Sequence, residues 1–161
     1  MKIYVCATKG ISLASRIIRW KQWGYPYTHL AYIGTEIDDP DNPTVIEAWW
    51  SGVEKCKLSK NHTPGTEYSI FSYDVISAEA TANERFMHAQ IGKSYDYRGL
   101  LGFVFYSKAL DEKSRWWCSE ILFAAALKTS VCLFRDTDPA EVDPRLFLKS
   151  PRLIHEGDYK L

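Results

Sequence analysis

The sequence predicts an α+β domain in which helices pack against one face of an antiparallel β-sheet or barrel. Two observations lead to this fold class: strand-like segments fill most of the first half, and helical patterns dominate after them. The chain has 161 residues, 46% of them hydrophobic, and shows no internal repeat or linker. We therefore expect a single domain over 1–161, large enough to bury a sizeable core.

The first half of the chain carries the strand signals. Alternating β-forming residues predict strands at five places: Lys2–Ala7, His29–Gly34, Thr44–Trp50, Val53–Leu58 and Thr66–Tyr73. Only Ser51 and Gly52 separate the third strand from the fourth, which predicts a hairpin. Between the first two strands, apolar residues at helical spacing predict a helix over Ser12–Trp23, ended by Gly24-Tyr25-Pro26.

The second half is expected to be mainly helical. A helix is predicted over Ser77–Ile91, capped by Ser77 and ended by Gly92. The remaining expected elements are a central helix, a short helix or turn and a last strand: Lys113–Lys128, Asp143–Leu148 and Leu153–Glu156.

Charge and composition exclude several classes of function. The 20 basic and 20 acidic residues give a formal net charge of zero, which argues against broad binding to nucleic acid or to an anionic membrane. No signal peptide is visible, and the longest apolar runs, Gly99–Tyr106 and Ile121–Leu127, are too short to cross a bilayer. A cytoplasmic location is the resulting expectation.

The cysteines and histidines form no metal-binding pattern. None of the four cysteines belongs to a CxxC pair, and the four histidines are not placed at zinc-finger spacing from them. We therefore expect free thiols, no metal and no cofactor. Most of these residues are interpreted as small core fillers or as structural or solvated histidines: Cys6, Cys56, Cys132, His62, His88 and His155.

Cys118 is the candidate nucleophile, because it lies in the segment Arg115–Glu120, where an apolar helix begins. The N-terminus of a helix carries partial positive charge and unpaired N–H groups, which favour thiolate over thiol. The same residue shares a helical stripe with Ile121 and Leu122, so the local pattern also allows a buried filler cysteine.

Two residues far upstream are candidates to assist the thiol. His29 opens an alternating strand and shares its predicted face with Ala31 and Ile33, where it is either a satisfied structural histidine or a base. Glu47 lies inside an apolar strand, where it either points to solvent or pairs with a cation. If the two strands are neighbours, Glu47 can orient His29 as the third member of a triad.

Four segments in this order resemble the circularly permuted branch of the papain-like, NlpC-type cysteine peptidases and amidases, the YiiX/YebB-like group. Tyr27–Ala31 is similar to its histidine motif and Val45–Ala48 to its acidic motif. Gly92–Asp96 is similar to the segment before the nucleophile, and Trp117–Leu122 to the cysteine motif. The resemblance implies a permuted papain-like fold with Cys118 as nucleophile.

The resemblance also implies that His29 is the base and Glu47 the orienting acid of a thiol hydrolase. Such an enzyme cleaves an amide or related acyl bond of a peptide or small-molecule substrate through an acyl-enzyme. The oxyanion would be held by the Cys118 backbone N–H and a second donor, for which Tyr95 and Tyr4 are candidates, and Trp117 is a candidate for substrate contact.

Two alternatives remain open from the sequence. The same triad can transfer an acyl group to an amine or alcohol instead of water. The chain can also be a non-catalytic module whose aromatic groove holds a ligand, with four tryptophans as its candidate walls: Trp49, Trp50, Trp116 and Trp117. The oligomeric state and the identity of the substrate are not predicted.

Overall fold

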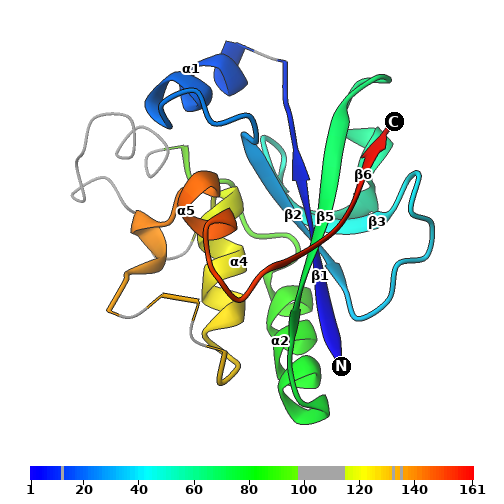
Figure 1. Ribbon diagram of the computed structural model, residues 1–161, viewed down its shortest axis with the longest axis vertical. Coiled ribbons are helices and arrows are strands. Elements are labelled where there is room, and N and C mark those ends of the chain that lie inside the picture. Colours follow the sequence, from blue (N-terminus) through cyan, green and yellow to red (C-terminus); the bar gives the residue numbers. More distant parts are fainter. Residues whose placement is uncertain (12, 98–114, 132, 135) are drawn as a thin grey trace.

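The structure is a computed structural model that describes residues 1–11, 13–97, 115–131, 133–134 and 136–161. Its described strands form one antiparallel sheet in the order β4-β3-β2-β1-β5-β6 (Figure 1). The strands are β1 (Lys2–Thr8), β2 (His29–Gly34), β3 (Thr44–Trp49), β4 (Gly52–Lys57), β5 (Glu67–Asp74) and β6 (Ile154–Lys160). This sheet is open, with β4 and β6 at its edges.

Helices lie mainly on one side of the sheet (Figure 1). The described α-helices are α1 (Leu13–Lys21), α2 (Ser77–Gln90), α4 (Cys118–Ala126) and α5 (Pro144–Leu148). Two short 3₁₀ turns accompany them, η1 (Leu58–Lys60) after β4 and η3 (Pro139–Glu141) before α5. The α+β class predicted from the sequence is confirmed, as an open sheet packed against helices.

Two hydrophobic clusters cover the two faces of the sheet because side chains alternate along each strand. In β1, Ile3 and Val5 belong to the larger cluster, which also contains most of α4. Cys6 belongs to the smaller cluster, against which Tyr4 packs. The helix α4 is apolar from Ile121 to Ala126, and every one of its residues, including the polar Ser119 and Glu120 of its first turn, is buried.

The predicted strands agree with the structure to within one or two residues, except that β6 extends to Lys160. The expected helix over Lys113–Lys128 is shorter, because Trp116 is still extended and bridges to Tyr95. The expected cap from Ser77 is also wrong. The N-cap position is Ile76, whose backbone N–H donates instead to the Glu79 carboxylate at 3.2 Å.

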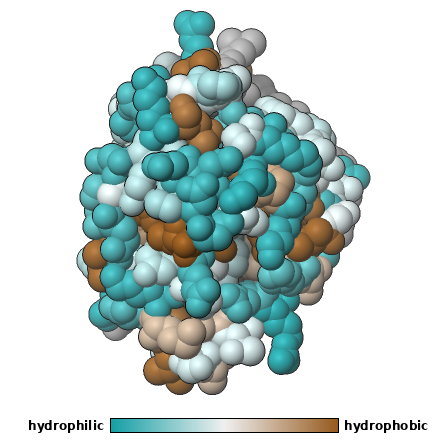
Figure 2. All heavy atoms as spheres, turned by 90° about the vertical axis from the view of Figure 1, so that its right-hand side faces the viewer, coloured by the Kyte–Doolittle hydropathy of each residue, from teal (hydrophilic) through white to brown (hydrophobic). Residues whose placement is uncertain are grey.

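Some expectations fall outside the described residues: Ser12 in the first helix, the run Gly99–Tyr106, the first two residues of Lys113–Lys128, and Cys132. Within the part of the chain that the structure describes, no helix is both long and apolar enough to span a bilayer. Figure 2, a view from the right-hand side of Figure 1, shows a mostly hydrophilic face with small hydrophobic patches.

Candidate active site

Cys118 is the first residue of α4, as the sequence predicts for a cysteine at a helix start. Its neighbour Trp117 is the N-cap residue in extended conformation, and the backbone N–H of Trp117 donates to the Glu120 carboxylate at 3.3 Å. The next residue, Ser119, donates its hydroxyl to the Val142 carbonyl at 2.5 Å, which anchors this turn to the segment before α5. The thiol is therefore held at the positive end of a buried helix.

His29 is the first residue of β2 and lies opposite Thr8 of β1. Its strand neighbours Ala31 and Ile33 belong to the smaller cluster, so its side chain lies on the predicted face. The residue is 8% exposed, so its ring needs partners for both nitrogens.

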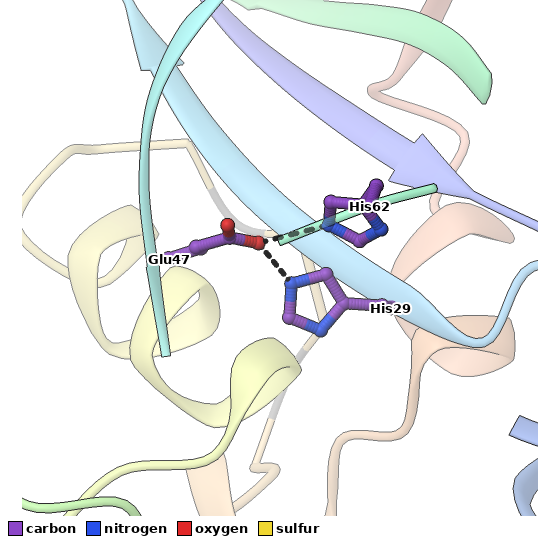
Figure 3. Close-up of side chains that lie close together, drawn as sticks. All are labelled: His29, Glu47 and His62. Atoms are coloured by element: carbon purple, nitrogen blue, oxygen red, sulfur yellow. Dashed lines mark hydrogen bonds and ion pairs between the residues drawn. The ribbon is translucent and has the colours of Figure 1, made fainter. Parts of the chain in front are cut away.

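Glu47 lies in β3, the strand next to β2, and its side chain is fully buried. The solvent-facing alternative for this residue is therefore wrong. Its Oε2 lies 2.6 Å from Nε2 of His29 (Figure 3). Its other oxygen, Oε1, accepts a hydrogen bond from Asn61 Nδ2 at 2.9 Å and lies 3.7 Å from the sulfur of Cys56.

His62 also contacts Glu47, and the sequence did not indicate it. Its Nε2 lies 3.1 Å from Oε2 of Glu47, the same oxygen that His29 contacts (Figure 3). The residue follows η1 in a loop, where its backbone N–H donates to the Leu58 carbonyl at 3.2 Å, and its side chain is buried. A histidine in a polar loop carries no periodic signal, so only the tertiary structure shows that it faces inward.

The Cys118 thiol contacts His29 from the other side. Burial by itself lowers the pKa of the His29 imidazole, but the negative charge and hydrogen bond of Cys118, and those of Glu47, outweigh it and raise that pKa. Because Nε2 is directed at Glu47, Nδ1 is the nitrogen left for the sulfur, and Figure 3 shows the second ring nitrogen pointing away from Glu47. The structure thus brings together Cys118, His29 and Glu47.

Burial alone would raise the pKa of the Glu47 carboxyl. The hydrogen bonds and positive charges of His29 and His62 outweigh this effect and hold that pKa well below its usual range. The carboxylate is therefore ionised at neutral pH, which is the state needed to hold an imidazolium.

A small pocket opens beside the thiol. It has a volume of about 50 Å³, where one water needs about 10–15 Å³ on the same measure. The Cys118 thiol, the His29 imidazole and His62 are part of its wall. The described lining residues are Thr8, Gly10, Ser15, Ile18, Thr28, His29, Ala48, Trp49, Trp50, His62, Tyr95 and Cys118. The pocket has room for a reacting group rather than for a whole peptide.

Tyr95 is the one candidate oxyanion donor that the structure places in this pocket. Burial, together with the charge of Cys118, raises the pKa of its phenol well above the usual value, so its hydroxyl stays protonated and able to donate. Tyr4 packs against the smaller cluster instead, and Trp117 is buried in the larger one. Neither is among the described residues that line the pocket, so both expectations are corrected.

The structure does not place the four tryptophans of the expected aromatic groove together. Trp49 and Trp50 line the pocket, whereas Trp116 packs against Phe86 with ring centroids 5.9 Å apart. Because Trp117 is buried in the core, the four tryptophans do not share one surface.

Comparisons with known proteins identify a fold but no family. No family model matches the chain, and the search of curated proteins found no match. Among solved structures, the chain is similar to the crystal structure of metalloprotein yiiX from Escherichia coli O157:H7, DUF1105. The two are 13% identical, with a TM-score of 0.69, over 98% of this chain and 96% of that chain. At this identity the similarity shows a shared fold.

These findings overturn the expectation that the chain belongs to the permuted papain-like, NlpC-type peptidases. No family model supports that membership, and the similar structure is described as a metalloprotein of an uncharacterised family. The short motifs on which the expectation rested are each too brief to define a family. The finer prediction of a permuted papain-like fold is likewise not confirmed.

Proposed function

We propose that the chain is a thiol hydrolase that cleaves an amide or related acyl bond at Cys118. The observation that carries the proposal is the position of His29, which contacts the Cys118 thiol on one side and the Glu47 carboxylate at 2.6 Å on the other. A nucleophile, a base and a group that orients the base form the arrangement used in covalent acyl transfer. All three converge beside a pocket that can admit a reacting carbonyl.

In the first half of the reaction, the Cys118 sulfur attacks the carbonyl carbon and a C–S bond forms. The proton that the thiol gave up resides on Nδ1 of His29, and Glu47 stabilises the resulting imidazolium through Nε2–H. Collapse of the tetrahedral intermediate breaks the bond to the leaving amine, which takes the proton from His29. The product of this half is a thioester on Cys118 and a free amine.

In the second half, water replaces the amine. His29 accepts a proton from the water as its oxygen bonds to the acyl carbon, and the C–S bond then breaks to release the acid. The backbone N–H of Cys118, at the start of α4, is the first donor to the oxyanion in both halves, because first-turn N–H groups have no partner within the helix. Tyr95 supplies the second donor from the pocket wall.

The test uses p-nitrophenyl acetate, a small activated ester that fits a narrow pocket. We expect a burst of one nitrophenolate per chain and an acetyl group on Cys118 in the mass spectrum. His29→Ala should slow acylation by about 10²–10⁴-fold as a lost general base, and Glu47→Gln should slow it less.

Cys56 provides a matched control thiol. It is half-buried and free, but it lies beside the Glu47 carboxylate rather than beside an imidazole. Burial and the charge of Glu47 raise the pKa of Cys56 to about 12, so it should stay unacylated, and Cys56→Ser should keep the burst. A Cys118→Ser chain that retains the burst and the acetyl group elsewhere would overturn the proposal.

Hydrolysis and acyl transfer differ only in the acceptor that enters the second half. Adding a primary amine after the burst measures the competition, because a transferase converts most of the acyl group to the amide whereas a hydrolase releases the acid. The binding-module alternative predicts no acyl-enzyme at all.

A further inference from the structure

His62 is a buried titratable residue that the proposed thiol chemistry does not use. Its Nε2 and that of His29 both point at one oxygen, Oε2 of Glu47, at 3.1 and 2.6 Å (Figure 3). One ligand atom from each of these three side chains lies within 4.8 Å of the other two. Two imidazoles and one carboxylate converging in this way are a typical ligand set of a transition-metal site.

We propose that His29, Glu47 and His62 bind a divalent cation of the zinc type. Imidazole nitrogen and carboxylate oxygen suit Zn²⁺ and Co²⁺, and two histidines with one glutamate leave a fourth position for water. The dication would take the place of the protons between the two Nε2 atoms and Oε2. Metal–ligand distances of about 2.0–2.2 Å require His29 and Glu47 to separate by about 1 Å, a shift that side-chain torsions can supply.

The surroundings of these three ligands fit a metal site. Asn61 donates to Oε1 of Glu47 at 2.9 Å, so the second carboxylate oxygen is already held and Oε2 is left for the cation. The ring of Trp49 packs against both imidazoles, with centroids 5.0 Å from His29 and 4.8 Å from His62. A hydrogen-bonded outer partner and an apolar wall are what orient ligands and exclude bulk water in metal sites.

Occupation of this site would switch off the thiol hydrolase, an inference that rests on the proposed function. His29 contributes Nε2 to the metal and keeps Nδ1 for Cys118. When Nε2 is bound to the cation, the imidazole carries its one proton on Nδ1. Nδ1–H can then donate a hydrogen bond to the sulfur, but Nδ1 cannot accept the proton of the thiol. Bound zinc therefore prevents His29 from acting as the general base, and a chelator that removes the zinc should restore the activity.

The test measures binding without any substrate. Protein treated with EDTA is dialysed against Zn²⁺, and we expect one ion per chain and a raised melting temperature. His62→Asn should weaken binding at least tenfold, since loss of even an outer partner costs about 10–100-fold. His155→Asn is the matched control, because His155 forms a similar pair with Asp158 at 3.0 Å but is exposed.

Co²⁺ distinguishes this site from zinc capture by the thiol. A site of two imidazoles and a carboxylate gives visible bands without thiolate-to-cobalt charge transfer, and Cys118→Ser should leave the spectrum unchanged. A charge-transfer band that Cys118→Ser removes, or undiminished zinc binding in His62→Asn, would overturn the proposal. The wild-type cobalt spectrum decides the question even if the His62 variant does not fold.

A separate experiment measures the effect of zinc on the reactivity of the Cys118 thiol. Zn²⁺ should slow acetylation of Cys118 by p-nitrophenyl acetate in the wild type, EDTA should reverse the effect, and His62→Asn should show no difference with and without zinc. Acylation without zinc binding refutes only the metal site, and zinc binding without acylation refutes only the thiol hydrolase.

Discussion

Replacing the buried Glu47 by glutamine tests whether the network around it depends on an ionised carboxylate. Its two oxygens accept from His29, His62 and Asn61 over 2.6, 3.1 and 2.9 Å, and the side chain is fully buried. Glutamine has a single acceptor oxygen and an NH₂ group of its own. At least one of these three donors, the buried His29 and His62 or the half-buried Asn61, therefore meets another donor in Glu47→Gln.

The size of the effect follows from counting these bonds. One unsatisfied buried donor costs about 1–3 kcal/mol, and each of the two remaining bonds loses about 1 kcal/mol when it is no longer charge-assisted. The free energy of unfolding should fall by about 3–5 kcal/mol at pH 7, which agrees with the range for removing one partner of a buried ion pair. The control is Glu54→Gln. Glu54 is the half-buried cross-strand neighbour of Glu47, and its substitution should lower the free energy of unfolding by less than about 1 kcal/mol.

Urea unfolding in EDTA, followed by tryptophan fluorescence, measures both variants. Because the pKa of Glu47 is lowered in the folded protein, its contribution is present above its ordinary value of 4.5 and is lost as the pH falls through the lowered value. The difference between wild type and Glu47→Gln should therefore narrow in acid. A difference below about 1 kcal/mol at pH 7, or one that widens in acid, would refute an ionised Glu47.

Two further predictions concern the frame around the site. Gly52 has φ of +118°, and a Cβ there would lie 2.6 Å from the Lys93 carbonyl oxygen. Gly92 has φ of +89° but open space around its Cα, so Gly92→Ala should cost only the backbone strain of about 1–2 kcal/mol. Gly52→Ala should therefore lower the melting temperature more than Gly92→Ala. Equal melting temperatures would contradict that close approach. Asn83→Ala should cost about 1–3 kcal/mol in urea unfolding, because buried Asn83 donates to the Ala125 carbonyl of α4 at 2.8 Å; a loss under about 0.5 kcal/mol would contradict it.

Much of the local structure was predictable because it depends on short-range patterns. Alternation gave the limits of β2, from His29 to Gly34, and predicted which face His29 occupies. The apolar run after Cys118 predicted a helix start close to that residue, although bridging of Trp116 to Tyr95 moved the start to Cys118 itself. That correction needed a contact between segments far apart in the sequence.

The site was predictable only in part, for the same reason. Cys118, His29 and Glu47 lie at strand or helix positions, where periodicity restricts the direction of a side chain. His62 lies in a loop with no such pattern, and its meeting with Glu47 depends on how the chain turns after η1. Tyr4 shares its face of β1 with Thr8, which lines the pocket, but Tyr4 itself packs against the smaller cluster and is not among the described lining residues.

The sequence by itself determined the elements, their order and the fold class, since propensity and hydrophobic period act over a few residues and report directly on burial. Only the tertiary structure decided that β2 and β3 are neighbours and that the start of α4 meets the ring of His29. It also decided that a second imidazole, from His62, shares the Glu47 oxygen. These are long-range contacts, whose pairing depends on the packing of the whole core and not on any one segment.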